Sequence, residues 1–376
     1  MKLLQIVPAI HEFPDLAAFD AEFRLTQRDL ILTNARYDAR YIKPAGLPCP
    51  VIFREQFGSS EPNDRMVNAI LARKQELHAS VPGGIDRIIA IGGGSIMDMA
   101  KVLAVAPEGT KDVNDLYPGM AELKRQHELI AVPTTCGTGS EVTNISIVFR
   151  SALGTKHGLV GDALYPVHAV LIPQLLETLP YHVFACSAID ALIHAVESYL
   201  SPLATPLTDV FGELAMREIV RGFAVVAADR AALPSLYGQF LRAAANAGVA
   251  FGNAGCGPVH ALSFALGGKY HVPHGESCYQ YFMPVLRFYK AAGAADKLAR
   301  LEALLAETLH AEDGLNALAE LLERILPRKP MSAYGAVEAD VEAFARSTID
   351  NQQRLLGRAC VPVTLDVARG IIADCL

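Results

Sequence analysis

The feature that most constrains the fold of this chain is a change of sequence pattern near residue 178. Before this point, short runs rich in β-branched and other apolar residues alternate with helical stretches, which is typical of a parallel sheet covered by helices. After it, the strand signals stop and long stretches rich in alanine and leucine follow, as at 209–228 and 297–310. The predicted strands lie at 29–34, 50–55, 87–92, 129–133 and 168–173.

This pattern predicts two domains, an α/β domain over residues 1–178 and an all-helical domain over residues 179–376. A chain of 376 residues is long for a single hydrophobic core. A hydrophobic content of 51% provides enough apolar side chains to build two cores. We therefore expect a globular protein in which each domain buries its own core.

Charge and cysteine content narrow the classes of partner. The formal net charge is −7, and the chain lacks blocks of Lys and Arg, which argues against nucleic acid or an anionic membrane and favours a small-molecule substrate. Pro8, His11 and Glu12 interrupt the N-terminal apolar residues before a signal-peptide core forms, and no other segment is expected to approach the length and apolar composition of a membrane span. Seven scattered cysteines without a CxxC pair predict free thiols in a cytoplasmic protein.

Four residues in the second half of the chain have the types and spacing of a metal site. Asp190 and His194 are four residues apart in an apolar stretch that reads as a helix, so one helix face presents both. His260, at a predicted helix start, and His274, in a predicted Pro/Gly loop, would complete the set. Three imidazoles and one carboxylate suit Fe(II), Zn(II) or another borderline cation better than Mg or Ca.

Each of these pairs also has an ordinary interpretation. Asp190 and His194 could be a simple helix pair, His260 a buried polar group and His274 a loop residue. An unpaired ionisable group is costly in apolar surroundings, however, and all four lie in apolar sequence. One shared cation is therefore the favoured explanation.

A glycine-rich turn at 92–94 follows the predicted strand at 87–92 and precedes a predicted helix. Its glycines would let a phosphate approach main-chain N–H groups at a helix N-terminus, which favours an anion. Ser95 and Asp98 have the spacing of a capping box. We interpret this segment as a pyrophosphate cradle, although it is not GxGxxG and an ordinary turn before a capped helix is the alternative.

A second polar loop, 133–144, follows the buried strand at 129–133. Hydroxyl groups at the carboxyl end of a parallel strand lie where α/β sheets bind ligands. The alternative is a polar turn whose hydroxyls bond locally to the backbone. The hydroxyl side chains of this loop that could contact a ligand are Thr134, Thr135, Thr138 and Ser140.

Four signatures, in chain order, resemble those of the iron-containing (group III) alcohol dehydrogenases. They are GGGSIMDMAK (92–101), PTTCGTGSE (133–141), DALIHAVESY (190–199) and the pair His260 and His274. Together they extend the resemblance over essentially the whole chain. Within this family the chain is most similar to the 4-hydroxybutyrate dehydrogenase branch, at 29–34, 253–276, 328–330 and 351–356.

The resemblance implies a dehydroquinate synthase-like architecture, in which an α/β dinucleotide-binding domain precedes an all-α metal-binding domain. It implies NAD as cofactor and Fe(II) as metal, with Zn(II) or another divalent cation as the alternative. The implied metal ligands are Asp190, His194, His260 and His274. The implied cofactor contacts are Gly93, Gly94, Ser95 and Asp98 at the pyrophosphate, Thr134, Thr135 and Thr138 along the cofactor cleft, and Lys156 nearby.

Two positions depart from the family pattern. Phe264 stands where many members have a histidine that relays the alcohol proton, so His271, a ribose hydroxyl or water would have to take this role. Asn34 stands where many members have an aspartate that meets the adenine ribose and repels a 2′-phosphate. NAD remains the expected cofactor, with NADP as the alternative.

The resemblance further implies reversible hydride transfer between 4-hydroxybutyrate and succinate semialdehyde, in a homodimer or higher homo-oligomer. A substrate carboxylate needs a cation, and we expect Arg354 to provide it, with Lys269 second, although either could be a solvated surface charge. The alternatives are a dehydrogenase of the same family acting on a diol, lactaldehyde or another short primary alcohol, and a metal-dependent hydrolase that needs no nicotinamide.

Overall fold

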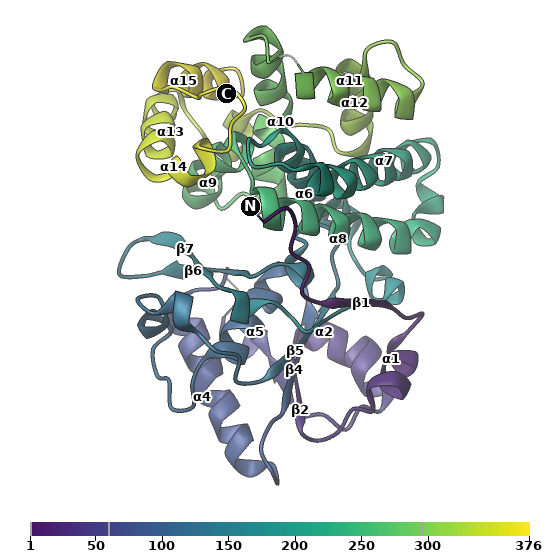
Figure 1. The fold of residues 1–376 in the computed structure, drawn as a ribbon, viewed down its shortest axis with the longest axis vertical. Coiled ribbons are helices and arrows are strands. Elements are labelled where there is room, and N and C mark those ends of the chain that lie inside the picture. The colour runs from purple at the N-terminus through teal and green to yellow at the C-terminus, as the bar shows by residue number, and fades with distance from the viewer. Residues whose placement is uncertain (1, 59–60, 295) are drawn as a thin grey trace. The chain divides into compact units, whose positions relative to one another are not determined.

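The computed structural model describes residues 2–58, 61–294 and 296–376, which form two compact units (Figure 1). The α/β unit comprises Ile6–Thr135 and Gly139–Leu179. The helical unit comprises Pro180–Leu376. The N-terminal segment up to Gln5 and the short stretch Cys136–Thr138 also pack with the helical unit, so part of the polar loop that follows the fifth strand belongs to it.

The α/β unit is built on a parallel sheet of six strands in the order β1-β8-β5-β4-β2-β3. The five predicted strands are confirmed as β2, β3, β4, β5 and β8. The edge strand β1 was not predicted, because its sequence AIHE is polar and mostly exposed. The bounds are β1 Ala9–Glu12, β2 Asp29–Thr33, β3 Val51–Phe53, β4 Arg87–Gly92, β5 Glu128–Pro133 and β8 His168–Leu171.

Alternate residues of the central strands point into two separate cores, as expected for a parallel sheet covered on both faces. Leu30 and Leu32 of β2 pack in the core that includes α4 and α5, whereas Ile31 packs in the core that includes α1. Figure 1 shows α4 and α5 on one side of the sheet and α1 and α2 on the other. The helix bounds are α1 Leu16–Phe23, α2 Ala35–Tyr37, α3 Lys43–Ala45, α4 Asp64–Ser80 and α5 Gly94–Val105.

An antiparallel hairpin of β6 (Ile145–Arg150) and β7 (Thr155–Val160) stands apart from the main sheet. The sequence analysis did not predict it, because both strands mix polar residues with apolar ones and neither is fully buried. Gly154 has φ of +64° in the connecting turn, a backbone conformation that glycine adopts at little cost. The hairpin supplies backbone groups that meet the buried charges of α5.

The helical unit is arranged around α6, whose residues from Phe184 to Leu200 are almost all buried. It packs against α7, α8 and α10. In the described part of residues 180–376 there is no strand, as the sequence pattern predicted. The helices are α6 Tyr181–Leu200, α7 Pro206–Ala228, α8 Tyr237–Ala254, α9 Pro258–Tyr270, α10 His274–Ala291, α11 Asp296–Leu309, α12 Gly314–Ile325, α13 Glu338–Asn351, α14 Gln353–Leu356 and α15 Leu365–Ala373.

Helix α6 corrects one expectation, because by length and composition it is apolar enough to cross a membrane. No such segment was expected from the sequence. In the structure, 89% of its most apolar window is buried inside the protein. Its apolar composition is therefore explained by its place in the core, where other helices surround it on every side.

Candidate active site

The four predicted metal ligands come together in the helical unit, with Asp190 at the centre. Asp190 and His194 lie one turn apart on α6, and His194 Nδ1 is 4.0 Å from Asp190 Oδ2. The Nε2 atoms of His260 and His274 lie 3.7 Å and 3.9 Å from Asp190 Oδ1. The ring centroids of His194 and His260 are 4.6 Å apart, and those of His260 and His274 are 5.4 Å apart. Three helices thus bring three imidazoles close to one carboxylate, that of Asp190.

The close approach of α10 to α6 depends on a glycine. A Cβ atom at Gly275 would lie 2.3 Å from the carbonyl oxygen of Cys186 and 3.2 Å from Asp190 Cβ, so no other residue fits without displacing backbone. His274 is the first residue of α10, with Pro273 as N-cap, and not part of a loop as predicted. The expected helix start near His260 is confirmed, since α9 begins at Pro258.

We call Asp190, His194, His260 and His274 the quartet. Three of its atoms are buried and lack a hydrogen-bond partner: Asp190 Oδ1, His194 Nδ1 and His260 Nε2. Buried polar atoms are nearly always satisfied, and leaving several unsatisfied at one point is costly unless a further group binds there. A divalent cation would satisfy all three at once. The donor set of one carboxylate oxygen and three imidazole nitrogens therefore fits a metal such as Fe(II) or Zn(II).

The charge states of the quartet also suit a cation. Burial, together with the neighbouring imidazoles, lowers the pKa of His194 to about 3, so its ring is neutral at physiological pH and able to ligate. Burial alone would raise the pKa of Asp190, but the three histidines lower it overall and keep the carboxylate ionised. Burial alone would lower the pKa of His260, but its hydrogen bond to Glu197 raises it overall, so the centre offers one carboxylate charge and one clearly neutral imidazole, His194.

Glu197 is a residue of this centre that the sequence analysis missed. It lies on α6 one turn beyond His194, and its Oε2 accepts a hydrogen bond of 2.6 Å from His260 Nδ1. The same carboxylate accepts from the main-chain N–H groups of Gly257 (2.9 Å) and Val259 (2.6 Å) at the start of α9. It therefore fixes the tautomer that leaves His260 Nε2 facing Asp190. The spacing of Glu197 on the Asp190 and His194 helix was the available signal.

Two cysteines lie beside the quartet. The Sγ atom of Cys278 lies within 4.8 Å of donor atoms of Asp190, His260 and His274. That of Cys256 lies equally close to donor atoms of His194 and His260. Burial, reinforced by nearby carboxylates, raises the pKa of both thiols well above the ordinary value, so both are protonated at neutral pH.

In the α/β unit, the predicted nucleotide residues lie at the carboxyl ends of neighbouring strands. The sheet order changes direction between β2 and β4, and such a switch point is where open α/β sheets bind ligands. Asn34 follows β2 there, and its Oδ1 atom is buried without a hydrogen-bond partner. Glu55, which follows β3, accepts from the Ala35 N–H at 3.2 Å. A carboxylate therefore stands beside Asn34, which the sequence analysis did not foresee.

The glycine turn after β4 packs against the loop after β5. Thr134 N donates to the carbonyl of Gly92 at 3.0 Å, and a Cβ atom at Gly93 would lie 3.3 Å from Thr135 Cγ2. The two predicted ligand-binding loops of the sheet are thus adjacent. Thr138, in contrast, lies in the stretch that packs with the helical unit.

The predicted capping box of Ser95 and Asp98 is wrong. Helix α5 has Gly93 as its N-cap and no side-chain capping hydrogen bond. Asp98 instead turns inward, where Oδ1 accepts from Ser140 Oγ at 3.2 Å and Oδ2 from the Ile147 N–H at 3.2 Å. The buried partners outcompete a cap because they satisfy both carboxylate oxygens.

Family models and proteins of known name match most of the chain. Residues 24–173 match the family model for iron-containing alcohol dehydrogenase, and residues 184–366 match the C-terminal model of the Fe-containing alcohol dehydrogenase family. The chain is 40% identical over 359 residues to 4-hydroxybutyrate dehydrogenase from Clostridium kluyveri, covering 95% of each chain. The chain belongs to the iron-containing alcohol dehydrogenase family. The resemblance drawn from the four signatures is confirmed.

Further similar proteins share less of the sequence, and two of them have solved structures with the same fold. The probable alcohol dehydrogenase EutG of Escherichia coli is 32% identical, covering 81% of this chain and 73% of its own. A crystal structure of 1,3-propanediol oxidoreductase matches with a TM-score of 0.83 at 25% identity over 100% of both chains. That of sulfoacetaldehyde reductase from Bifidobacterium kashiwanohense in complex with NAD+ matches with a TM-score of 0.84 at 22% identity, covering 99% of this chain and 98% of its own. These matches confirm the predicted fold class.

Three further residues singled out from the sequence, Lys156, Phe264 and His271, do not share a common environment. Lys156 on β7 pairs with Glu61 at 2.7 Å, and its charge also acts on Asp98. Phe264 lies beside His274, with ring centroids 6.2 Å apart. His271 ends α9 in a left-handed conformation with φ of +54°, and in the described part of the chain no hydrogen bond joins it to the quartet.

The two predicted carboxylate-binding cations differ in what they contact. Lys269 forms an ion pair with Asp340, to which Tyr270 also donates at 2.6 Å, so its charge is already engaged. Arg354 is exposed on α14, and its charge acts on Cys256, beside the quartet. Arg354 therefore remains the better candidate for binding a substrate carboxylate.

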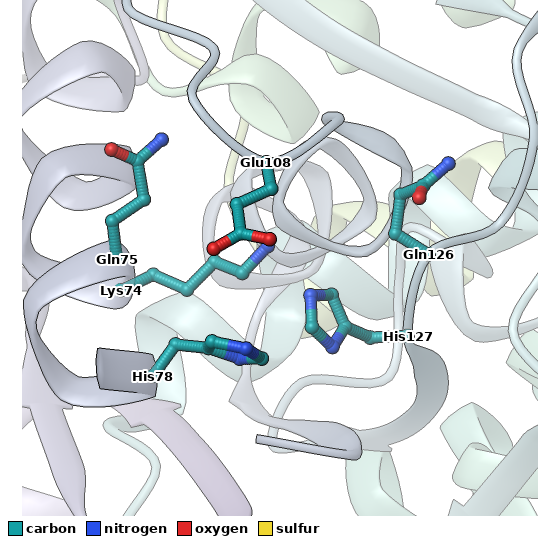
Figure 2. Close-up of a pocket in the computed structure, with 6 residues that line it drawn as sticks. All are labelled: Lys74, Gln75, His78, Glu108, Gln126 and His127. Carbon is teal, nitrogen blue, oxygen red and sulfur yellow. The ribbon is translucent and has the colours of Figure 1, made fainter. Parts of the chain in front are cut away.

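A pocket of about 100 Å³ in the α/β unit collects none of the predicted site residues (Figure 2). It includes His127, which precedes β5 and so lies at the amino end of the sheet, opposite the glycine turn. Burial lowers the pKa of His127 to about 4 and that of Lys74 to about 8. The pocket is lined by Lys74, Gln75, His78, Glu108, Gln126 and His127.

Proposed function

We propose that this family member transfers hydride reversibly between a primary alcohol and the nicotinamide of NAD, with 4-hydroxybutyrate and succinate semialdehyde as its substrate pair. The observation that carries the proposal is the convergence of Asp190, His194 and His260 atoms that are buried without a partner. The substrate pair rests on the 40% identity to a relative named 4-hydroxybutyrate dehydrogenase.

Asp190, His194, His260 and His274 would hold a divalent ion, which the family name gives as iron. Such an ion acts as a Lewis acid toward an alcohol or carbonyl oxygen. The protein's own part is to keep the donors fixed: Glu197 orients the ring of His260, and burial keeps His194 neutral.

The α/β unit would hold NAD at the switch point of the sheet. Gly93 is the N-cap and Gly94 the first residue of α5, whose N-terminus would favour the pyrophosphate. A relative in this fold carries NAD+ in its structure. Glu55 beside Asn34 supports NAD over NADP, because its negative charge would repel a 2′-phosphate.

The substrate's carboxylate would be bound by Arg354, whose guanidinium matches a carboxylate in geometry and charge. The proton of the alcohol would leave by His271, a ribose hydroxyl or water, since Phe264 takes the place beside His274. Relatives named for other substrates, such as 1,3-propanediol oxidoreductase, favour a neutral short alcohol as the second candidate.

The proposal is tested by NADH oxidation with succinate semialdehyde under anaerobic conditions, comparing chelator-stripped protein with protein reconstituted with Fe(II). We expect a rate only with metal, and a higher kcat/KM for succinate semialdehyde than for butyraldehyde, which has the same carbon chain but no carboxylate. Arg354→Ala should abolish that preference, while Arg346→Ala, an exposed arginine of α13, should keep it.

Three outcomes would contradict parts of the proposal. Equal kcat/KM for the two aldehydes would assign the enzyme to neutral alcohols. Unchanged preference in Arg354→Ala would remove that residue from carboxylate binding. Absence of NAD(H) binding would favour a metal-dependent hydrolase, the one reading in which the quartet activates water without a nicotinamide.

A further inference from the structure

A second group of metal-type donors lies at the starts of α6 and α10. The Nε2 atom of His182 is 3.4 Å from Glu276 Oε2, and the Sγ atom of Cys186 lies 3.8 Å from the ring nitrogens of His182. One donor atom from each of the three residues lies within 4.8 Å of the donor atoms of the other two. No role in hydride transfer has been given to any of them.

We propose that His182, Cys186 and Glu276 bind a second divalent cation of the zinc type, distinct from the ion of the quartet. One nitrogen, one sulfur and one oxygen donor form a set that zinc accepts readily. Tetrahedral bonds of roughly 2.0–2.3 Å place ligand atoms roughly 3.3–3.7 Å apart, and the two separations seen here, 3.4 and 3.8 Å, are close to this.

The fold positions these donors before any ion arrives. His182 and Cys186 are four residues apart on α6, so both side chains lie on one helix face. Gly275 brings the first turn of α10 against the Cys186 backbone, which places Glu276 beside them. Tyr334 donates to the other carboxylate oxygen of Glu276 at 2.7 Å and so holds Oε2 toward His182.

Two of the three donors are buried and one is half exposed, so a bound ion would be held inside the protein and still be reachable from solvent. Cys186 and Glu276 are buried, whereas the His182 side chain is 50% exposed. An ion could therefore enter from solvent and keep water in its fourth position, as at zinc sites with three protein ligands. On binding, the Cys186 thiol would give its proton to water and the thiolate would ligate.

The proposed ion would join α6 and α10 close to Asp190 and His274. Cys186 lies one turn before Asp190 on α6, and Glu276 lies two residues after His274 on α10. Its binding would therefore brace the geometry of Asp190 and His274 without contacting the substrate. The inference does not depend on which alcohol the enzyme uses, because it rests on donors outside the quartet.

The test uses Co(II) as the probe, because a thiolate ligand gives Co(II) a charge-transfer absorption that an Asp and His set does not. The metal-free full-length protein is titrated with Co(II), and bound metal is counted after gel filtration. We expect two equivalents per chain and the thiolate absorption. Cys186→Ser and His182→Ala should each bind one equivalent, and Cys186→Ser should lose the absorption. His182→Ala changes an exposed side chain, so it tests the site even if Cys186→Ser fails to fold.

Cys360→Ser, at an exposed thiol, serves as the matched control and should keep two equivalents and the absorption. A single equivalent that shows no thiolate absorption, or that His182→Ala leaves in place, would overturn the inference. So would an absorption that survives in Cys186→Ser but disappears in Cys278→Ser or Cys256→Ser, since the thiolate would then belong to the quartet. The number of bound Co(II) ions is measured without turnover. A failure of the proposed alcohol oxidation would therefore leave the test of the second metal site unaffected.

Discussion

The two units each bury a cluster of ionisable groups, but they satisfy them in opposite ways. In the α/β unit, the Lys101 ammonium donates to Ser140 Oγ at 2.8 Å, to Thr143 Oγ1 at 3.1 Å and to the Ile145 carbonyl at 2.8 Å. All three of its N–H groups are used. In the helical unit, the quartet leaves three atoms of Asp190, His194 and His260 facing one another without a partner.

Burial shifts the groups of both clusters toward neutrality. In the α/β unit it raises the pKa of Asp98 to about 6 and that of Glu141 to about 7, and lowers that of Lys101 to about 8. In the quartet it lowers the pKa of His194 to about 3. Burial therefore does not distinguish the clusters. The difference is in hydrogen bonding: a cluster that closes on itself is structural, and one with converging unsatisfied atoms is built to bind a further group.

Removing a quartet histidine should give the largest effect. His274→Ala deletes one ligand without removing a core side chain, since this ring is partly exposed. We expect activity at background level and bound iron far below one equivalent, with the folded state retained, as measured by elemental analysis, turnover and thermal unfolding. His157→Ala, an exposed histidine on β7, should change neither quantity. Full activity without bound metal in His274→Ala would show that the cluster in the helical unit is not a metal-binding site.

Removing the ammonium of the α/β cluster should affect stability instead. Lys101→Met leaves the buried Asp98 and Glu141 carboxylates without their cation, which we expect to cost about 3–5 kcal/mol of unfolding free energy. Metal content should stay the same. Urea denaturation measures the cost, and Lys111→Met, at an exposed lysine, is the matched control. Unchanged stability, or lost metal, would mean that the two clusters are not divided into structural and ligand-binding roles.

The smallest effect is expected when the hydrogen bond between Glu197 and the quartet residue His260 is weakened. Glu197→Gln keeps one acceptor oxygen, which can serve the Val259 N–H group, while its NH2 group would replace the oxygen that accepts from Gly257 N–H and His260 Nδ1. We expect metal affinity to fall about 10–100-fold, with a smaller loss of stability than in Lys101→Met. Competition with a chelator measures the affinity, and Glu320→Gln, on the exposed face of α12, is the control. Unaltered affinity would show that Glu197 only caps α9.

Much of the α/β unit was predictable because its strands are buried on both faces and read as continuous apolar runs. The strand β1 and the hairpin of β6 and β7 were not, since their polar and exposed residues resemble loops. The supposed capping box failed for a related reason. Local spacing suggested that Ser95 and Asp98 cap a helix, whereas Asp98 bonds to Ser140 and Ile147, which are far along the chain.

The two-part pattern of the chain and the four residues of the quartet could be found without coordinates, because residue type and helical spacing are local properties. How the four residues meet follows from the packing of the helices. Gly275 lets α10 touch α6, Glu197 orients His260, and His274 begins a helix. These features depend on distances between segments far apart in the chain, and such distances follow from the packing of whole helices against one another.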